Sequence, residues 1–239
     1  MIRLKNVFHK YDTWDDYTLK NISCDIEQGE FIYLTGASES GKTTFLKMMC
    51  GDLDADKGFV GVQSYALKRL KKNKTYLLKR QVGAVFRDYE LLEYKTVYEN
   101  VAYVLEVTQY PVEKLEQRVL ETLAMVGLKY KALDSLSDCS VEERRRIAIA
   151  RAMVNDPRVL IVDEITLNLN AKPRINMLNL LHKINKLGTT VIMATQELDL
   201  IDHMPSRMIE LDDGAIKSDR SKNHILLILS DKMGEYYIS

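Results

Sequence analysis

A glycine-rich stretch at residues 36–44 limits most strongly what this chain can fold into. It reads GASESGKTT and matches the pattern G-x-x-x-x-G-K-T. The apolar run 31–35 before it is typical of a strand, and residues 44–50 after it are typical of a helix. A strand, a tight glycine turn and a helix N-terminus in this order predict a phosphate-binding loop inside an α/β fold.

The loop also predicts a chemistry. Gly36 and Gly41 allow a turn in which successive backbone N–H groups point toward an anion. Lys42 would reach the β- and γ-phosphates, and Thr43 would ligate Mg²⁺. We therefore expect the chain to bind a nucleoside triphosphate. The candidate nucleotide-binding residues of the loop are Gly36, Ala37, Ser38, Glu39, Ser40, Gly41, Lys42, Thr43 and Thr44.

A second strand-like run supplies the acidic partner that such a loop needs. Residues 158–162 are mostly apolar, and Asp163 and Glu164 follow them directly. A buried strand that delivers acid at its carboxyl end would place Asp163 near Mg²⁺. Glu164, one residue later, would face the γ-phosphate and could polarise a water molecule.

Composition excludes several classes of function. The chain has 239 residues, enough for one α/β domain, and its 34 basic and 34 acidic side chains cancel. This balance gives no reason to expect nucleic-acid binding. Three widely spaced cysteines fit neither a disulfide framework nor a metal site, so we expect a reducing cytoplasm.

The start of the chain alternates like a strand rather than like a signal peptide. Its longest apolar run, residues 225–229, is far shorter than the roughly 20 residues that span a bilayer. We expect no direct membrane span, and membrane association only through a partner.

The remaining segments can be placed in outline. Residues 1–35 resemble an antiparallel β layer. In that layer Tyr11 either stacks on a purine ring or simply covers the rim. Capping boxes at Thr96 and Ser140 open helices in the region 96–153. The basic stretch 68–74 is read either as a solvated helix face or as a contact for a membrane surface or a partner.

Taken together, Tyr11, the loop and the acid-ended strand resemble the ATPase subunits of ABC transporters. Within that family the chain resembles the cell-division ATPases of the FtsE type, in their Gram-positive form. This narrower likeness is carried by residues 78–83, 95–103, 147–152 and 234–236.

The resemblance implies a single ABC ATPase domain. Its P-loop NTPase core, with an antiparallel β subdomain, would comprise residues 1–87 and 154–220. An inserted α-helical subdomain would span 88–153, and 221–239 would form a divergent tail. It further implies ATP and Mg²⁺ as ligands, Tyr11 as a nucleotide contact, Thr43 and Asp163 as metal ligands, and Glu164 and Gln196 as catalytic residues.

The family pattern also implies partners. ABC ATPases dimerise head to tail, as homodimers or with another ABC ATPase. An FtsE-type chain works with an FtsX-like integral membrane protein, on the inner face of the cell membrane.

This chain departs from the family pattern where chemistry should occur. Arg87 replaces a glutamine that contacts Mg²⁺ and the attacking water, and a guanidinium cannot ligate a cation. In the six-residue signature, aligned with residues 139–144, Val141 and Glu142 replace two glycines. Gln196 replaces a histidine. The tail 221–230 looks inserted, either as an added edge strand or as a partner contact.

Three functions remain open on sequence alone. The chain could be an FtsE-like ATP-binding subunit with weak or absent hydrolysis. It could be a catalytically silent subunit paired with an intact ABC ATPase. It could also be the ATPase of a lipoprotein-release or peptide-export transporter. Residues 140–143 are best explained as a capped helix without a nucleotide contact.

Overall fold

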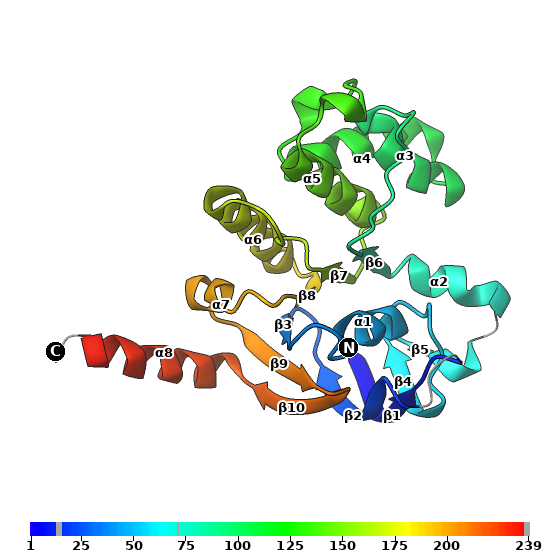
Figure 1. Ribbon diagram of the computed structural model, residues 1–239. Helices are drawn as coiled ribbons and strands as arrows, with labels where there is room; N and C mark the ends of the chain where they lie inside the picture. Colours follow the sequence, from blue (N-terminus) through cyan, green and yellow to red (C-terminus); the bar gives the residue numbers. More distant parts are fainter. Residues whose placement is uncertain (13–15, 71, 237–239) are drawn as a thin grey trace.

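The computed structural model describes residues 1–12, 16–70 and 72–236, and the side chains of all these except 72 and 230–236. In this part of the chain, strands form one six-stranded and one four-stranded sheet. A group of helices stands apart from the sheets at the top of Figure 1, and one helix projects toward the left of the picture. The architecture is the expected α/β fold.

The six-stranded sheet carries the phosphate-binding loop. Its strand order is β10-β9-β3-β8-β7-β6. The parallel strands are β3 (Phe31–Thr35), β6 (Val82–Val85), β7 (Val159–Asp163), β8 (Thr190–Ala194) and β9 (Arg207–Asp212), and β10 (Ala215–Arg220) returns antiparallel at the edge. Every residue of β3, β7 and β8 is buried. Strands covered on both faces are typical of the centre of a parallel sheet.

The prediction that residues 1–35 form one antiparallel layer is wrong for its last strand. β3 pairs in parallel with β8 and β9 instead. The antiparallel sheet consists of β1 (Ile2–His9), β2 (Leu19–Ile26), β4 (Lys57–Val62) and β5 (Tyr65–Ala66), in the order β2-β1-β4-β5. The burial patterns give the reason, because β1 and β2 bury only some positions whereas β3 buries all five.

Three helices form the group at the top of Figure 1: α3 (Val97–Val107), α4 (Val112–Met125) and α5 (Val141–Met153). Both predicted capping boxes are present, at Thr96 before α3 and at Ser140 before α5. The helices share a core built from their apolar stripes, which include Val97, Val101, Leu105, Val119, Leu123 and Ile147.

Further helices connect strands of the two sheets. They are α1 (Lys42–Met49), α2 (Thr75–Lys79), α6 (Ala171–Lys186) and α7 (Asp199–His203). Short 3-10 turns lie at Leu67–Arg69, Lys72–Lys74, Lys129–Lys131 and Leu136–Asp138. Two of these turns occupy the basic stretch 68–74. The sequence-based interpretation of this stretch as one helix face is therefore wrong. Lys71 lies outside the described residues.

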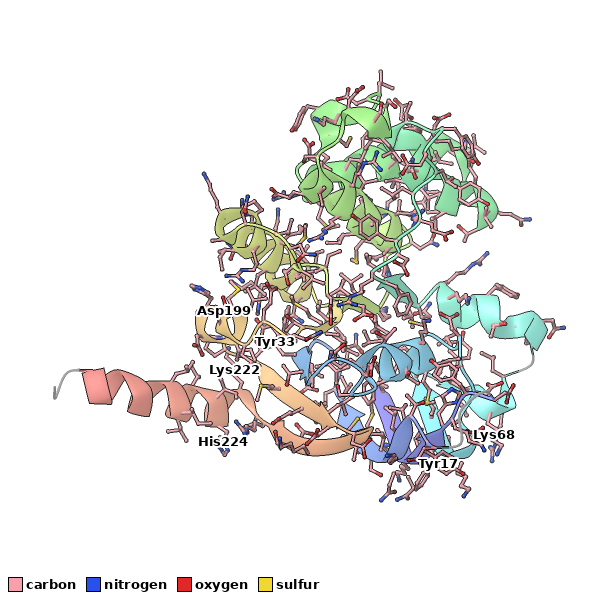
Figure 2. All side chains as sticks on the ribbon, in the orientation of Figure 1. Tyr17, Tyr33, Lys68, Asp199, Lys222 and His224 are labelled. Carbon is pink, nitrogen blue, oxygen red and sulfur yellow. The ribbon has the colours of Figure 1, made fainter. Side chains whose placement is uncertain are left out.

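The tail forms a helix, so the interpretation as an added edge strand is wrong. α8 (Lys222–Tyr236) follows β10 directly and projects away from the sheets (Figure 1). Lys222 and His224 mark its first turn in Figure 2. Ser221 begins the helix, because its carbonyl accepts from the Ile225 N–H at 3.1 Å. Five successive apolar residues at 225–229 lack the alternation of an edge strand.

No helix in the described part of the chain is both long enough and apolar enough to cross a membrane.

Candidate functional site

The loop between β3 and α1 has the conformation of a phosphate-binding loop. Gly36 and Gly41 adopt positive φ angles of 142° and 98°. A Cβ on Gly36 would lie 2.3 Å from the carbonyl oxygen of Leu211, so only glycine fits there. Gly41 caps α1 without a side-chain hydrogen bond, and the N–H groups of the first helical turn have no partner within the helix. These donors suit an anion.

The lysine of the loop lies in its expected place. The Lys42 side chain is buried, and its Nζ donates to the carbonyl oxygens of Gly36 and Ala37 at 2.8 and 2.6 Å. Burial lowers its pKa, with Asp163 acting in the opposite direction and Arg87 in the same direction. The ammonium group is thus held inside the loop, where a phosphate would meet it.

The two predicted metal ligands meet, although 120 positions separate them in the sequence. The Thr43 hydroxyl donates to Asp163 Oδ2 at 2.7 Å. Asp163 is the last residue of β7, and the loop follows the end of β3. These two strands are parallel and flank β8, so their carboxyl ends lie at the same edge of the sheet. A hydroxyl and a carboxylate are hard oxygen donors, and Mg²⁺ takes few protein ligands together with phosphates and waters. The donor pair therefore fits the metal that the family implies.

Tyr11 reaches the same helix from the β layer. Its hydroxyl lies 3.2 Å from Thr44 Oγ1, and its ring meets the His9 ring edge-on. A cavity of about 150 Å³ is lined by Tyr11 together with Thr18, Ser38, Glu39, Gly41, Lys42, Thr43, Thr44, Arg87, Glu164 and Gln196. The loop, Tyr11, Glu164 and Gln196 are thus brought to one site.

Glu164 is held by two neighbours. It has a left-handed backbone (φ 50°) and is nearly buried. Gln196, from the loop after β8, donates its Nε2 to Glu164 Oε1 at 2.7 Å. Arg87, after β6, forms an ion pair with Glu164 Oε2. Both carboxylate oxygens therefore have a partner.

Sequence reasoning identified Arg87 as a departure but missed its partner. The strand order that brings the two together is seen only in the structure, where β6 and β7 are adjacent parallel strands and both end just before these charges. Residues that follow the carboxyl ends of neighbouring parallel strands lie close together.

The signature region has the form of a helix start. Ser140 accepts from the Glu143 N–H, and the Glu143 side chain accepts from the Ser140 N–H. Val141 is exposed, and Glu142 forms an ion pair with Arg146 at 2.8 Å. This cation offsets part of the negative charge that Glu142 brings to a position where the family has glycine.

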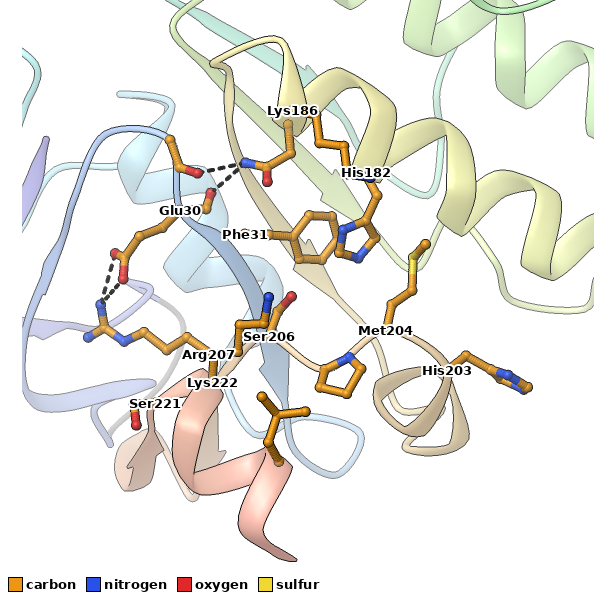
Figure 3. Close-up of a pocket in the computed structure, with 14 residues that line it drawn as sticks. Glu30, Phe31, His182, Lys186, His203, Met204, Ser206, Arg207, Ser221 and Lys222 are labelled. Atoms are coloured by element: carbon orange, nitrogen blue, oxygen red, sulfur yellow. Dashed lines mark hydrogen bonds and ion pairs between the residues drawn. The ribbon is translucent and has the colours of Figure 1, made fainter. Parts of the chain in front are cut away.

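A larger cavity, about 740 Å³, lies away from this site. It opens at the amino ends of β3 and β9, beneath the first turn of α8. Figure 3 shows the Phe31 and His182 rings stacked there and Arg207 paired with Glu30. Ligands of open α/β sheets bind at the carboxyl ends of the strands, so we assign the nucleotide to the smaller cavity.

Comparisons with known proteins agree with this geometry. The family model described as ABC transporter matches residues 19–167. The cell division ATP-binding protein FtsE of Streptococcus pneumoniae is 41% identical over 93% of this chain and 96% of its own length. FtsE of Bacillus subtilis is 38% identical over 93% and 97%, and FtsE of Escherichia coli is 37% identical over 90% and 96%.

Solved structures give the same result. An ATP-binding cassette solved as a dimer in a post-hydrolysis state, bound to ADP and Pi, superposes with a TM-score of 0.82 at 29% identity, over 93% of this chain and 99% of that one. The chain cbiO1 of Clostridium perfringens, part of an ABC transporter complex, is 23% identical and shares the fold, with a TM-score of 0.86 over 95% of this chain and 90% of that one. This chain is therefore a member of the ABC transporter ATPase family, similar over most of its length to the FtsE cell-division proteins.

Proposed function

We propose that this chain is the ATP-binding subunit of an FtsE-type ABC complex in cell division, with slow or absent hydrolysis of its own. The observation that carries the proposal is the phosphate-binding loop, with Lys42 folded into it and Thr43 bonded to Asp163. The FtsE relatives, similar over nearly their whole length, support the cell-division role.

ATP would lie in the cavity lined by the loop, with Tyr11 at its rim. The loop N–H groups and Lys42 would hold the phosphates. Thr43 and Asp163 would hold Mg²⁺, which neutralises phosphate charge when it is bound. Glu164 and Gln196 are the candidate catalytic residues, at the γ-phosphate end.

Slow turnover follows from the departures around the γ-phosphate position. Arg87 stands in place of a glutamine that contacts Mg²⁺ and the attacking water, and Gln196 stands in place of a histidine. In the structure, Gln196 donates to one oxygen of Glu164 and Arg87 pairs with the other. The two replacements remain whether or not Arg87 stays paired with Glu164.

The complex would consist of two ATPase subunits and an FtsX-like membrane protein. One structural relative was solved as a dimer, which supports dimerisation of this chain. The chain would act at the cytoplasmic face of the membrane through this partner.

Thermal unfolding with Mg-ATP tests nucleotide binding. At a ligand concentration of 100 times Kd, binding adds about 2.7 kcal/mol to the free energy of unfolding. For a chain of this size that raises Tm by roughly 5–10 °C. Lys42→Ala should abolish the shift, whereas Lys47→Ala, in the last turn of the same helix, should keep it. An unshifted wild-type Tm would overturn the proposal.

A phosphate-release assay measures turnover, with Glu164→Gln as the reference. We expect wild type to stay well below about 1 s⁻¹, the low end of ordinary enzyme turnover. A faster wild-type rate, abolished by Glu164→Gln, would contradict slow hydrolysis.

The engaged Glu164 also favours a second candidate, a silent subunit that pairs with an intact ABC ATPase. Affinity purification from the native cell distinguishes the two. Recovery of a second, intact ABC ATPase in equal amount would favour the pair, and recovery of this chain with a membrane protein alone would favour the homodimer.

A further inference from the structure

The Arg87–Glu164 ion pair stands between two cavities. Both residues line the nucleotide cavity, and both also line a second cavity of about 270 Å³ together with Phe86, Tyr89, Arg145, Asp163, Ile165 and Leu167. The Arg87 side chain is 50% exposed, whereas that of Glu164 is 6% exposed. The carboxylate is therefore fixed in the wall, and the guanidinium is the partner with room to move.

Arg87 changes the charge of the nucleotide cavity. Two cationic side chains, Lys42 and Arg87, line the cavity together with two carboxylates, Glu39 and Glu164, and Asp163 adds a third carboxylate beside Thr43. The glutamine that the family carries at position 87 would leave Lys42 as the one cationic side chain among these five. Arg87 thus adds a permanent cation beside the place of the γ-phosphate.

A guanidinium suits this place by its chemistry. It is charged at every pH of interest, and its planar set of donors matches the oxygens of a phosphate in two parallel hydrogen bonds. Movement from Glu164 to a phosphate would exchange one charge-assisted contact for another. Gln196 would still hold the carboxylate that Arg87 leaves.

We propose that Arg87 is a built-in cation that leaves Glu164 to contact the terminal phosphate of a bound nucleoside triphosphate, so that this chain binds triphosphate without Mg²⁺ and prefers it to diphosphate. The proposal rests on the nucleotide site described above. It assigns to Arg87 part of the charge neutralisation that a metal ion supplies when it is bound.

Isothermal titration with ATP and ADP, each in Mg²⁺ and in EDTA, tests this proposal. For wild type we expect EDTA to raise the Kd for ATP less than about tenfold. For Arg87→Gln we expect a rise of about 100-fold or more, the effect of losing a charge-assisted contact. The preference of wild type for ATP over ADP in EDTA should disappear in the same variant.

Two further variants sharpen the test. Glu164→Gln removes the competing carboxylate, so it should tighten ATP binding in EDTA by about tenfold. Arg158→Gln is the matched control, because this exposed arginine precedes β7 at the opposite end of the sheet, and it should behave like wild type.

The outcomes separate this inference from the proposed function. Absence of ATP binding even in Mg²⁺ would overturn both. If wild type and Arg87→Gln both bind Mg-ATP, and EDTA weakens the two equally, the inference on Arg87 is overturned and the nucleotide site stands. Since Arg87→Gln is also measured with Mg-ATP, a folding defect in that variant would be seen as loss of binding in both conditions. In that case the Glu164→Gln variant decides the question. If its Kd for ATP in EDTA equals that of wild type, the inference is overturned, and if its Kd is lower, the inference is supported.

Discussion

Single side chains in this molecule depend on contacts that come from distant parts of the chain. Lys42 is held by carbonyls of its own loop, but Glu164 takes its partners from the ends of two other strands. The same residue types without these neighbours would have different chemistry. A carboxylate without a cationic partner is a base, and a carboxylate paired with arginine is a weaker base.

His182 shows the same dependence in the larger cavity. Its ring stacks on Phe31 at 3.9 Å, and burial, together with Lys186 and Lys222, lowers its pKa to about 4. In the unfolded chain this histidine has a pKa of about 6.5, so as the pH falls it takes up a proton in the unfolded state before it does so in the folded state. We therefore predict that the free energy of unfolding decreases between pH 6.5 and pH 4 through this residue, by about 1–2 kcal/mol because solvent screens part of the effect at a half-buried ring.

Urea unfolding across this pH range measures the effect. His182→Gln removes the titrating group, so its stability should fall less steeply with acid than that of wild type. His203→Gln, an exposed histidine on the same cavity, is the matched control and should keep the wild-type slope. Equal slopes in all three proteins would show that His182 contributes nothing.

Helices α3 and α5 begin in the same way, each with a reciprocal capping box. The buried Asn100 adds side-chain hydrogen bonds to the cap of α3. Its side chain accepts from the Leu92 N–H and donates to carbonyls that include those of Leu92 and Thr96. It therefore fixes the segment before α3, which follows Arg87 in the chain.

The caps predict that Ser140 has a structural role in the single subunit. We expect Ser140→Ala and Thr96→Ala each to cost about 1 kcal/mol of stability, because each leaves a helix N–H without its acceptor. Denaturant unfolding measures this loss. Titration of the monomer with Mg-ATP should give the wild-type Kd for both variants. A weaker Kd for Ser140→Ala alone would mean that the residue does more than cap α5.

At the scale of the whole molecule, the parallel sheet assembles the site. Residues near positions 36–44, 87, 163 and 196 meet because β3, β6, β7 and β8 end at one edge. The signature region lies on α5, in the separate helical group (Figure 1). In a head-to-tail dimer that region would face the nucleotide of the partner.

Dimerisation should therefore respond to the first residues of α5. Val141 and Glu142 add side chains where close backbone approach is needed, and Arg146 offsets part of the charge of Glu142. We predict that Val141→Gly combined with Glu142→Gly, in a Glu164→Gln background, tightens the ATP-dependent dimer about tenfold or more. Light scattering after size-exclusion chromatography with ATP measures the dimer fraction.

The chain contains a matched control for this double substitution. Val112 and Glu113 are the first two residues of α4, just as Val141 and Glu142 are the first two of α5. Val112 and Glu113 are both exposed. Val112→Gly combined with Glu113→Gly also places two glycines at the start of a helix, with the same cost in helix stability, but away from the signature region. Equal dimer fractions for the two double variants would count against a role for residues 141–142 in the interface.

The sequence by itself determined the features that depend on local geometry. The loop at 36–44 needs glycine backbone freedom and a following helix, and the caps at Thr96 and Ser140 need two residues three positions apart. The apolar run before Asp163 is likewise local. Such features are written in consecutive residues, so the pattern predicts them directly.

Only the tertiary structure decided how distant segments pair. It placed 31–35 in the parallel sheet, formed the tail into a helix, and paired Arg87 with Glu164. Strand order sets such contacts, and a short apolar run has the same local pattern in either sheet. The physical reason is that strand pairing and charge pairing are fixed by burial between elements far apart in the chain, which local pattern does not encode.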